Sequence, residues 1–231
     1  MAGLGTIVNV AAIIGGALLG VLLKRGLPQH WQQTMMSGIA LCIFVIGLQM
    51  ALATTNIIIT IVSLASGAII GESLAIEKRL NDLGAWVGQQ VAGKEPGAAK
   101  KIAEGFISAT LLFCIGAMAV VGSIQDGLAG NHTTLFAKAT LDGIISVVLG
   151  ANLGIGVALS ACSVGIYQGC ITALAGFFEQ YVTGSVLTEI TAAGGVMIMA
   201  IGTNMLHITQ IRISNLLPGI ITAALISIYF G

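Results

Sequence analysis

The stretch CIGAMAVVGSIQDGL, residues 114–128, is apolar enough for a lipid bilayer and yet rich in small side chains. Gly116, Ala119, Ser123 and Asp126 follow one another in steps of three and four residues, which place side chains on one face of an α-helix. Lipid supplies no hydrophobic force between helices, so a face of small residues allows the close contact that holds a membrane bundle together. The stripe predicts either a packing groove that ends in a solvated acid or one wall of a solute path.

The composition of the whole chain agrees with a membrane environment. Of the 231 residues, 56% are hydrophobic and only 8% are charged, against roughly 25% charged in an average soluble domain. The mean hydropathy is +1.01, and the 32 glycines against three prolines suit helices that pack through small faces. We therefore expect an all-α, multi-pass transmembrane domain over residues 1–231, with membrane lipid as a partner and no nucleic acid.

Eight apolar stretches approach the length of a membrane-spanning helix. They cover residues 5–23, 34–53, 57–75, 105–123, 135–155, 158–178, 190–208 and 213–230. The first lacks a basic leader and a cleavage site, so it is expected to remain as a helix. The segment 135–178 has no charged break, and it reads either as two helices or as one broken or re-entrant segment, which leaves counts of eight or seven helices.

The basic residues predict the orientation. If the first helix runs inward, eight of the nine lysines and arginines fall on the inner side, and Lys138 alone falls on the outer side. Cytoplasmic loops carry the excess of positive charge, so both termini are expected outside and the loop 76–104 in the cytoplasm. A seven-helix count would move Arg212 to the outer side, so the charges favour eight.

The loop begins with IEKRLNDLGAWVGQQV, residues 76–91, in which apolar and polar residues separate onto opposite helical faces. This pattern predicts an amphipathic helix on the inner membrane surface, and the lysines that follow it suit anionic lipid. The helix should break at 93–97, in GKEPG. The alternative is that the loop, residues 75–104, recruits a regulatory partner.

A short motif that occurs twice, here called the internal echo, suggests a repeat. VIGLQM (45–50) and AIGTNM (200–205) share the pattern of an apolar residue, Ile-Gly, one variable residue, an amide and Met. Their predicted helices run in opposite directions, as in inverted repeats. The echo therefore raises the alternative that the first three helices are repeated, inverted, in the last three.

Two polar residues lie within the predicted spans where a charge or an amide is costly. Asp142 lies inside the fifth span, and Lys138, one helical turn earlier, could neutralise it as an ion pair. The other interpretation makes Asp142 a proton- or cation-coupling acid. Asn9 shares a face with Gly16 and Gly20. An amide on this face either stabilises helix packing through hydrogen bonds to another helix or forms part of a solute path.

Glycines around Asn152, at positions 150, 154 and 156, predict an unwound backbone that lines a site. Further polar residues complete the expected substrate or ion path, which comprises Asn9, Gln49, Asp142, Asn152, Tyr167, Gln168 and Asn204. The glycines expected to serve helix packing are Gly16, Gly20, Gly116 and Gly122. Three acids at helix ends, Glu72, Glu104 and Glu189, are interpreted as boundary residues.

Several chemistries have no support in the sequence. It contains no phosphate-binding G-x-x-x-x-G-K-[ST], no H-E-x-x-H and no G-x-S-x-G. The four cysteines lie in apolar segments without C-x-x-C spacing. We expect no enzymatic activity, no cofactor and no metal site.

Four motifs resemble a known family. FCIGAMAVVGSIQDGL (113–128), LDGI (141–144), YQG (167–169) and NLLPG (215–219), with the glycine-rich first helix, are similar to the bacterial multi-pass membrane proteins of domain of unknown function 554. The resemblance covers essentially the whole chain. It implies a protein of the bacterial cytoplasmic membrane that is suspected of transport, and it provides no substrate or site residue to transfer.

The function hypothesis is a small secondary transporter or facilitator for a small solute or an ion. A chain of this size leaves little room for a path within one protomer, so we expect a homo-oligomer, most simply a dimer. A non-transporting scaffold or sensor is the first alternative, and it predicts complete helices without a polar cavity. An oligomeric ion channel is the second.

Overall fold

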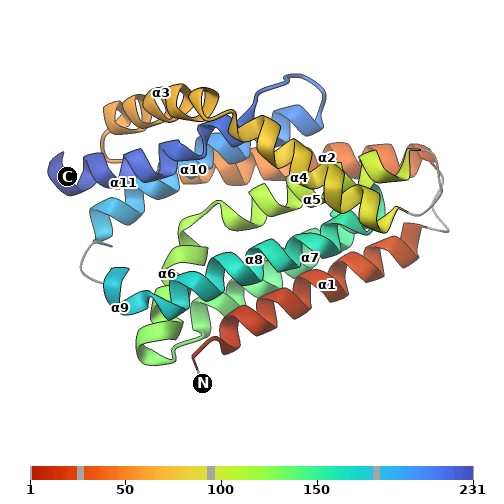
Figure 1. Ribbon diagram of the computed structural model, residues 1–231, viewed down its shortest axis with the longest axis horizontal. Helices are drawn as coiled ribbons and strands as arrows, with labels where there is room; N and C mark the ends of the chain where they lie inside the picture. Colours follow the sequence, from red (N-terminus) through yellow and green to blue (C-terminus); the bar gives the residue numbers. More distant parts are fainter. Residues whose placement is uncertain (1, 25–28, 93–96, 179–182, 231) are drawn as a thin grey trace. The chain divides into compact units, whose positions relative to one another are not determined.

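The computed structural model describes residues 2–24, 29–92, 97–178 and 183–230, and every regular element in these ranges is a helix (Figure 1). The elements are α1 (Leu4–Lys24), α2 (Gln29–Ala51), α3 (Ile57–Ser73), α4 (Ile76–Val91), α5 (Ala98–Cys114), α6 (Ala117–Ala129), α7 (Thr133–Leu153), α8 (Gly156–Ala173), α9 (Ala175–Phe178), α10 (Gly184–Met205), the 3₁₀-helix η1 (Ile213–Leu216) and α11 (Pro218–Phe230). The all-helical prediction is confirmed. The helix break expected at residues 93–97 lies outside the described residues from position 93 to position 96.

Within the described residues, five helices are long and apolar enough to cross a membrane, namely α1, α2, α7, α8 and α10. Two bent pairs, α3 with α4 and α5 with α6, raise the number of candidate crossings to seven if each pair is one span. Residues 213–229 add a shorter apolar helix. Each of the eight apolar stretches in the sequence thus corresponds to helical structure.

The helices group into two compact units. The first contains Met1–Met36, Asn81–Cys114 and Met118–Phe178, and the second contains Ser37–Leu80, Ile115–Ala117 and Glu179–Gly231. The sequence predicts a single transmembrane domain, and the contacts divide this domain into two compact units.

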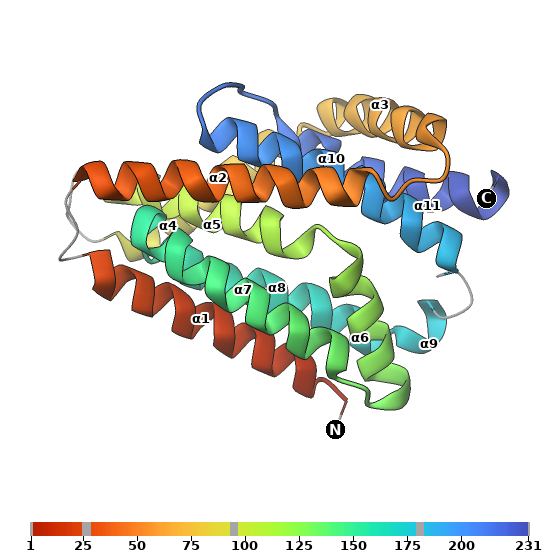
Figure 2. The same ribbon diagram turned by 180° about the vertical axis from the view of Figure 1, so that it is seen from behind.

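In the first unit, α1 and α7 lie side by side along most of their length, with α8 beside them (Figures 1 and 2). The contact depends on glycine. A Cβ atom on Gly16 would overlap the carbonyl oxygen of Gly143, and one on Gly20 would overlap that of Val147. Gly150 of α7 meets the backbone of Ala17 in the same way. Backbone-to-backbone contact of this kind is how small residues hold membrane helices together.

Helices α7 and α8 are separate elements joined by a tight turn at Gly154 and Ile155. Gly154 has φ +81°, a left-handed conformation that glycine adopts without steric cost. Residues 135–178 are therefore two helices, and the alternative of one merged segment there is wrong. The expected unwinding around Asn152 is also corrected, because α7 stays helical through Leu153 and the glycines form a turn between two long helices.

The stretch CIGAMAVVGSIQDGL, residues 114–128, does not form part of one continuous helix. α5 ends at Cys114, α6 begins at Ala117, and their axes differ by 64°. Gly116 has φ +139° and a Cβ there would meet a single side-chain atom, so its role is to permit the break. The assignment of Gly116 to helix packing is thereby corrected, and the predicted stripe keeps only Ala119, Ser123 and Asp126 on one helix, α6.

In the second unit, α2 and α10 cross in opposite directions through the two glycines of the internal echo. A Cβ on Gly47 would overlap the backbone of α10 near Gly195 and Met199, and a Cβ on Gly202 would overlap α2 near Ala40 and Phe44. The two contacts are reciprocal. Gly195 and Met199 lie seven and three residues before Gly202, and Ala40 and Phe44 lie seven and three residues before Gly47. This reciprocal contact fits the inverted repeat that the echo suggests.

Helix α3 packs on α11 and η1 in the second unit. Gly67 meets the backbone of Gly219, and Gly71 meets the backbone of Asn215. The Thr222 hydroxyl also donates to the Ser63 carbonyl at 2.9 Å. Asn215 and Pro218, both within NLLPG, therefore begin the last apolar helix against a glycine face of α3.

Candidate functional site

Four polar side chains of α1, α7 and α8 gather inside the first unit. Asn9 and Gln168 are fully buried, and Asp142 and Lys138 are 5% and 7% exposed. Asp142 lies nine residues after the start of α7 at Thr133 and eleven before its end at Leu153. At about 1.5 Å per residue it is about 14 Å from the start of the helix, near the middle of a candidate span.

Asp142 is the centre of the cluster. Its Oδ2 accepts hydrogen bonds from the Lys138 ammonium at 2.5 Å and from the Asn9 amide nitrogen at 3.1 Å. The same Asn9 nitrogen approaches Gln168 Oε1 at 3.4 Å. The ion pair expected from the i, i+4 spacing is thus present, and residues of α1 and α8 connect to it.

The cluster is closed by apolar groups but is not fully paired. The Lys138 nitrogen lies 6.0 Å from the centre of the Phe113 ring, a side chain that is 1% exposed. Among the described residues, Asn9 Oδ1, Gln168 Nε2 and Ser146 Oγ are buried without a hydrogen-bond partner. A buried polar atom left without a partner costs about 1–3 kcal/mol, and each such atom calls for an explanation.

The other predicted path residues lie elsewhere. Tyr167 is half-buried and lines an apolar groove on α8, next to Gln168 in sequence but on another face. The Asn152 amide donates to the Val148 carbonyl at 2.9 Å, one turn earlier in α7. Gln49 is exposed on α2 in the second unit. Only Asn9, Asp142 and Gln168 of the predicted set meet within one cluster.

Asn204, also in the second unit, organises a loop. Its Oδ1 accepts from the Thr209 hydroxyl at 2.7 Å and from Ile211 N at 2.9 Å, and its Nδ2 donates to Ile211 O at 2.8 Å. These three bonds use the amide to hold the segment that follows α10. Asn204 thereby has a structural role within the loop.

Two buried carboxylates were missed as structural centres by sequence reasoning. Asp126 is fully buried and accepts from Gly3 N and Gly5 N at 3.1 Å each, while its Oδ1 lies 2.8 Å from His132 Nδ1. It thus binds the first turn of α1, where free N–H groups and the helix dipole favour an anion. A solvated acid at the end of its own helix was the expectation, so that interpretation is corrected.

Glu189 is the second such carboxylate. It is 1% exposed and accepts from the Thr54 hydroxyl at 2.7 Å, from Thr55 N at 3.1 Å and from the Thr55 hydroxyl at 3.2 Å. It ties α10 to the loop between α2 and α3. The prediction of a simple boundary residue is wrong, because nothing local in the sequence signals a partner about 130 residues away.

Gly122, the remaining glycine assigned to packing, lies on α6. A Cβ there would overlap the side chain of Leu135 and meet that of Thr134 at the start of α7. The side chain of Gln125, three residues later on α6, accepts a hydrogen bond from the Thr134 hydroxyl at 2.7 Å. This contact, together with Asp126, fixes α6 against both α7 and α1.

An all-helical bundle with long apolar helices that meet backbone to backbone, and with a buried ion pair at mid-helix, defines an integral membrane protein. The chain belongs to the family described as protein of unknown function (DUF554), whose model matches residues 4–228.

Two relatives match over nearly the full chain. The uncharacterized membrane protein YdfK of Bacillus subtilis (strain 168) is 32% identical over 221 residues, which cover 94% of this chain and 92% of YdfK. The uncharacterized protein YqgA of Escherichia coli (strain K12) is 26% identical over 222 residues, which cover 95% and 94% of the two chains. No solved structure gives a significant match.

Proposed function

We propose that the protein is a secondary transporter or facilitator for a small solute or an ion, with the cluster of Asn9, Lys138, Asp142 and Gln168 as its coupling element. The observation that carries the proposal is the buried ion pair in the middle of α7. Charged residues inside a bilayer are costly and are therefore concentrated where transport or proton transfer requires them. The unpaired atoms of Asn9 and Gln168 give the cluster additional capacity to bind.

The chemistry of coupling follows from Asp142 Oδ2, which both Lys138 and Asn9 contact. A proton or cation that binds this oxygen competes with Lys138 for the carboxylate. The ammonium group must then find another partner or become exposed to water. Such an exchange changes the contacts between α1, α7 and α8, and it links occupancy of the site to helix position.

The localisation that fits this proposal is the bacterial cytoplasmic membrane, with both termini outside and residues 76–104 inside. We also propose a homodimer as the working unit. Mass measurement of the protein in its lipid or detergent shell tests the stoichiometry. A purely monomeric active preparation would remove the dimer from the proposal and leave the coupling element untouched.

The test is ion flux in liposomes that contain the purified protein and a trapped pH-sensitive dye. Proton movement is followed under imposed potassium and sodium gradients for the wild type, for Asp142→Asn and for the double variant Lys138→Met with Asp142→Leu. Replacing both members of a buried pair by apolar residues is often neutral or stabilising, whereas removing one costs about 3–5 kcal/mol. The double variant therefore separates folding from coupling.

We expect flux in the wild type, loss of flux in the folded double variant, and normal flux in the control Glu104→Gln, an exposed acid on α5. A folded double variant with unchanged flux would assign the pair to structure alone. Proton flux that follows only the proton's own electrochemical gradient, with no dependence on the sodium or potassium gradient, would instead identify a channel.

The scaffold alternative is favoured by one observation, the uninterrupted course of α7 through Asp142. Reaction of Asp142 with a hydrophobic carbodiimide distinguishes the two roles without knowledge of the substrate. A coupling carboxylate takes up a proton during its cycle and becomes labelled, and added coupling ion reduces the labelling. A permanently paired structural carboxylate stays unlabelled at every pH at which the protein is folded.

A further inference from the structure

A polar pocket of about 300 Å³ lies beside the loop that joins α10 to η1, within the second unit. Its walls are Glu77 at the start of α4, Asn204 at the end of α10, His207, and residues 209–212. Pockets that hold small molecules begin at about this volume. The pocket contains no part of the Lys138–Asp142 cluster, which belongs to the first unit.

The loop wall of the pocket is held in one shape by internal hydrogen bonds. Asn204 bonds Thr209 and both backbone groups of Ile211, and the hydroxyls of Thr203 and Thr209 lie 2.8 Å apart. His207 has φ +59°, a left-handed backbone conformation that residues other than glycine rarely adopt. Strained residues that the surroundings fix in place gather at ligand-binding and active sites.

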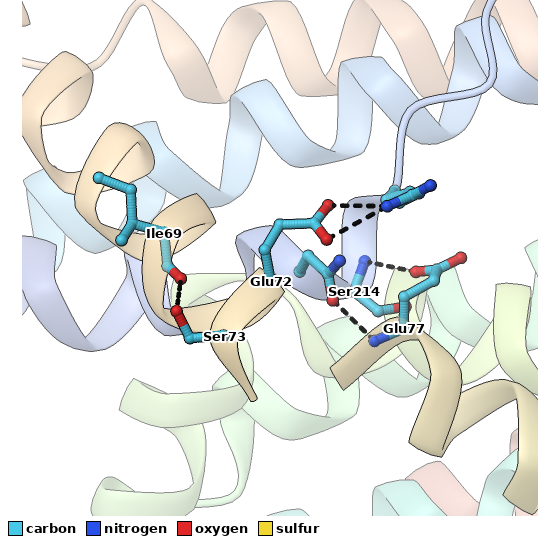
Figure 3. A network of polar contacts seen from close by, with 7 residues as sticks. Ile69, Glu72, Ser73, Glu77 and Ser214 are labelled. Atoms are coloured by element: carbon cyan, nitrogen blue, oxygen red, sulfur yellow. Dashed lines mark hydrogen bonds and ion pairs between the residues drawn. The ribbon is translucent and has the colours of Figure 1, made fainter. Parts of the chain in front are cut away.

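Glu77 and Arg212 line the pocket, and a second acid, Glu72, pairs with Arg212. Figure 3 shows Glu72 and Glu77 directed toward the same short segment around Ser214. Arg212 Nη1 contacts both carboxylate oxygens of Glu72 at 3.2 and 3.1 Å. Glu77 Oε2 accepts from Ser214 N at 3.2 Å, and Glu77 N donates to Asn215 Oδ1 at 2.7 Å.

These bonds position Arg212 and Glu77 without using all of their capacity. A guanidinium group carries five N–H donors, and the contacts with Glu72 involve only Nη1. Glu77 Oε1 accepts no hydrogen bond from the described residues, since its bond to Ser214 uses the other oxygen. The pocket therefore presents one cationic and one anionic group, each with free hydrogen-bonding capacity.

This combination selects against simple ions. An anion alone would meet the carboxylate of Glu77 in the lining and that of Glu72 beside Arg212, and a cation alone would meet the guanidinium of Arg212. We propose that the pocket binds a small zwitterion with one carboxylate and one ammonium group, the carboxylate facing Arg212 and the ammonium facing Glu77. Binding here does not depend on the proposed coupling element.

The test uses the purified full-length protein in lipid nanodiscs and a series of ω-amino acids from glycine to 5-aminovalerate, which differ in the distance between their charges. We expect at least one member to bind by calorimetry and to raise the unfolding temperature. Acetate and methylammonium, each with only one charge, should do neither at the same concentration. The N-acetyl and methyl-ester derivatives of the best ligand should also fail to bind.

Two variants assign the contacts. Glu77→Gln keeps an oxygen that can accept from Ser214 N, and Arg212→Gln removes only an exposed ion pair, so both should fold. Each should weaken binding at least tenfold, whereas Lys100→Gln, an exposed lysine on α5, should leave it unchanged.

Three results would overturn the proposal: no member of the series binds the wild type, acetate binds as well as the zwitterion, or binding survives in both variants. The ligand derivatives keep the test decisive even if a variant does not fold. The double variant Lys138→Met with Asp142→Leu should bind the zwitterion normally, so failure of this site and failure of the coupling proposal give different results.

Discussion

Several described helices approach one another at glycines, where a Cβ atom would overlap the neighbouring backbone, and two adjacent glycines of α1 allow a direct comparison. Gly16 faces the backbone of α7 at Gly143, whereas a Cβ on Gly15 would meet nothing within 4 Å. We expect Gly16→Ala to lower the free energy of unfolding by about 1–3 kcal/mol, because overpacked contacts of this kind force neighbouring backbone apart.

Gly15→Ala is the control for that substitution. Alanine has a higher helix propensity than glycine by about 1 kcal/mol, so this variant should be as stable as the wild type or more stable. Thermal unfolding in detergent measures both. Equal stability of the two variants would mean that α1 and α7 do not approach as closely as the glycines indicate.

A second residue-scale prediction concerns Asp126, which binds the N-terminal turn of α1 from a distant part of the sequence. Asp126→Ala leaves the N–H groups of Gly3 and Gly5 without their acceptor, which we expect to cost about 1–3 kcal/mol. Hydrogen exchange should accelerate at the first turn of α1 and stay unchanged at its C-terminal half. Asp82→Ala, on the exposed surface of α4, is the control and should change neither quantity.

The polar cluster shows how much of a site sequence reasoning can predict. Lys138 and Asp142 are four residues apart in one helix, so their pairing follows from helix geometry. The contact between Asn9 and Asp142 joins residues 133 positions apart, and the face shared by Asn9 and the glycines indicated only that the amide points inward. Which helix it meets depends on packing, which the sequence pattern does not contain.

At the scale of elements, α4 presents its two sides to different surroundings. Gly84 and Gly88 are buried against Ile107 and Ala99 of α5. Leu83 and Trp86, on other faces, are 45% and 59% exposed. Exposed apolar side chains on an amphipathic helix fit burial about 5–10 Å into the membrane interface.

We therefore predict that Trp86 contacts lipid at shallow depth. The chain has two tryptophans, so Trp31→Phe leaves Trp86 as the only one. Its fluorescence should be quenched more by lipids brominated near the headgroup than by lipids brominated at mid-chain. Trp86→Phe reports on Trp31 and provides the comparison. Absence of quenching by any brominated lipid would place α4 in water or against protein.

The break between α5 and α6 marks the limit of prediction for elements. Residues 105–123 form an uninterrupted apolar run, and glycine occurs in helices of this chain far more often than at breaks. Gly16 and Gly116 look alike in sequence, yet one allows close packing and the other a positive φ. The turn at Gly154 was predicted only in part: the three glycines indicated a departure from helix near Asn152, but the length of the segment left open two helices or one broken segment.

At the scale of the whole molecule, the number of crossings determines on which side each end of the chain lies. The long helices and bent pairs give up to seven candidate crossings. Residues 213–229 decide the parity. Helix α11, with thirteen residues at about 1.5 Å each, and η1, with four at about 2.0 Å each, together give about 28 Å, close to the roughly 30 Å of a bilayer core.

We predict that this last helix crosses the membrane, so that both termini lie outside. Its exposed side chains include Ile221, Leu225 and Tyr229, which suit contact with lipid. Alkaline phosphatase, which is active only outside, should be active when fused at either end of the full-length chain. A green fluorescent protein fused after Leu206 should fluoresce, because that point precedes the last crossing and lies with Arg212 on the basic side. A fluorescent fusion at the full-length C-terminus would show that residues 213–229 stay on one surface, and would leave an odd number of crossings with the two ends on opposite sides.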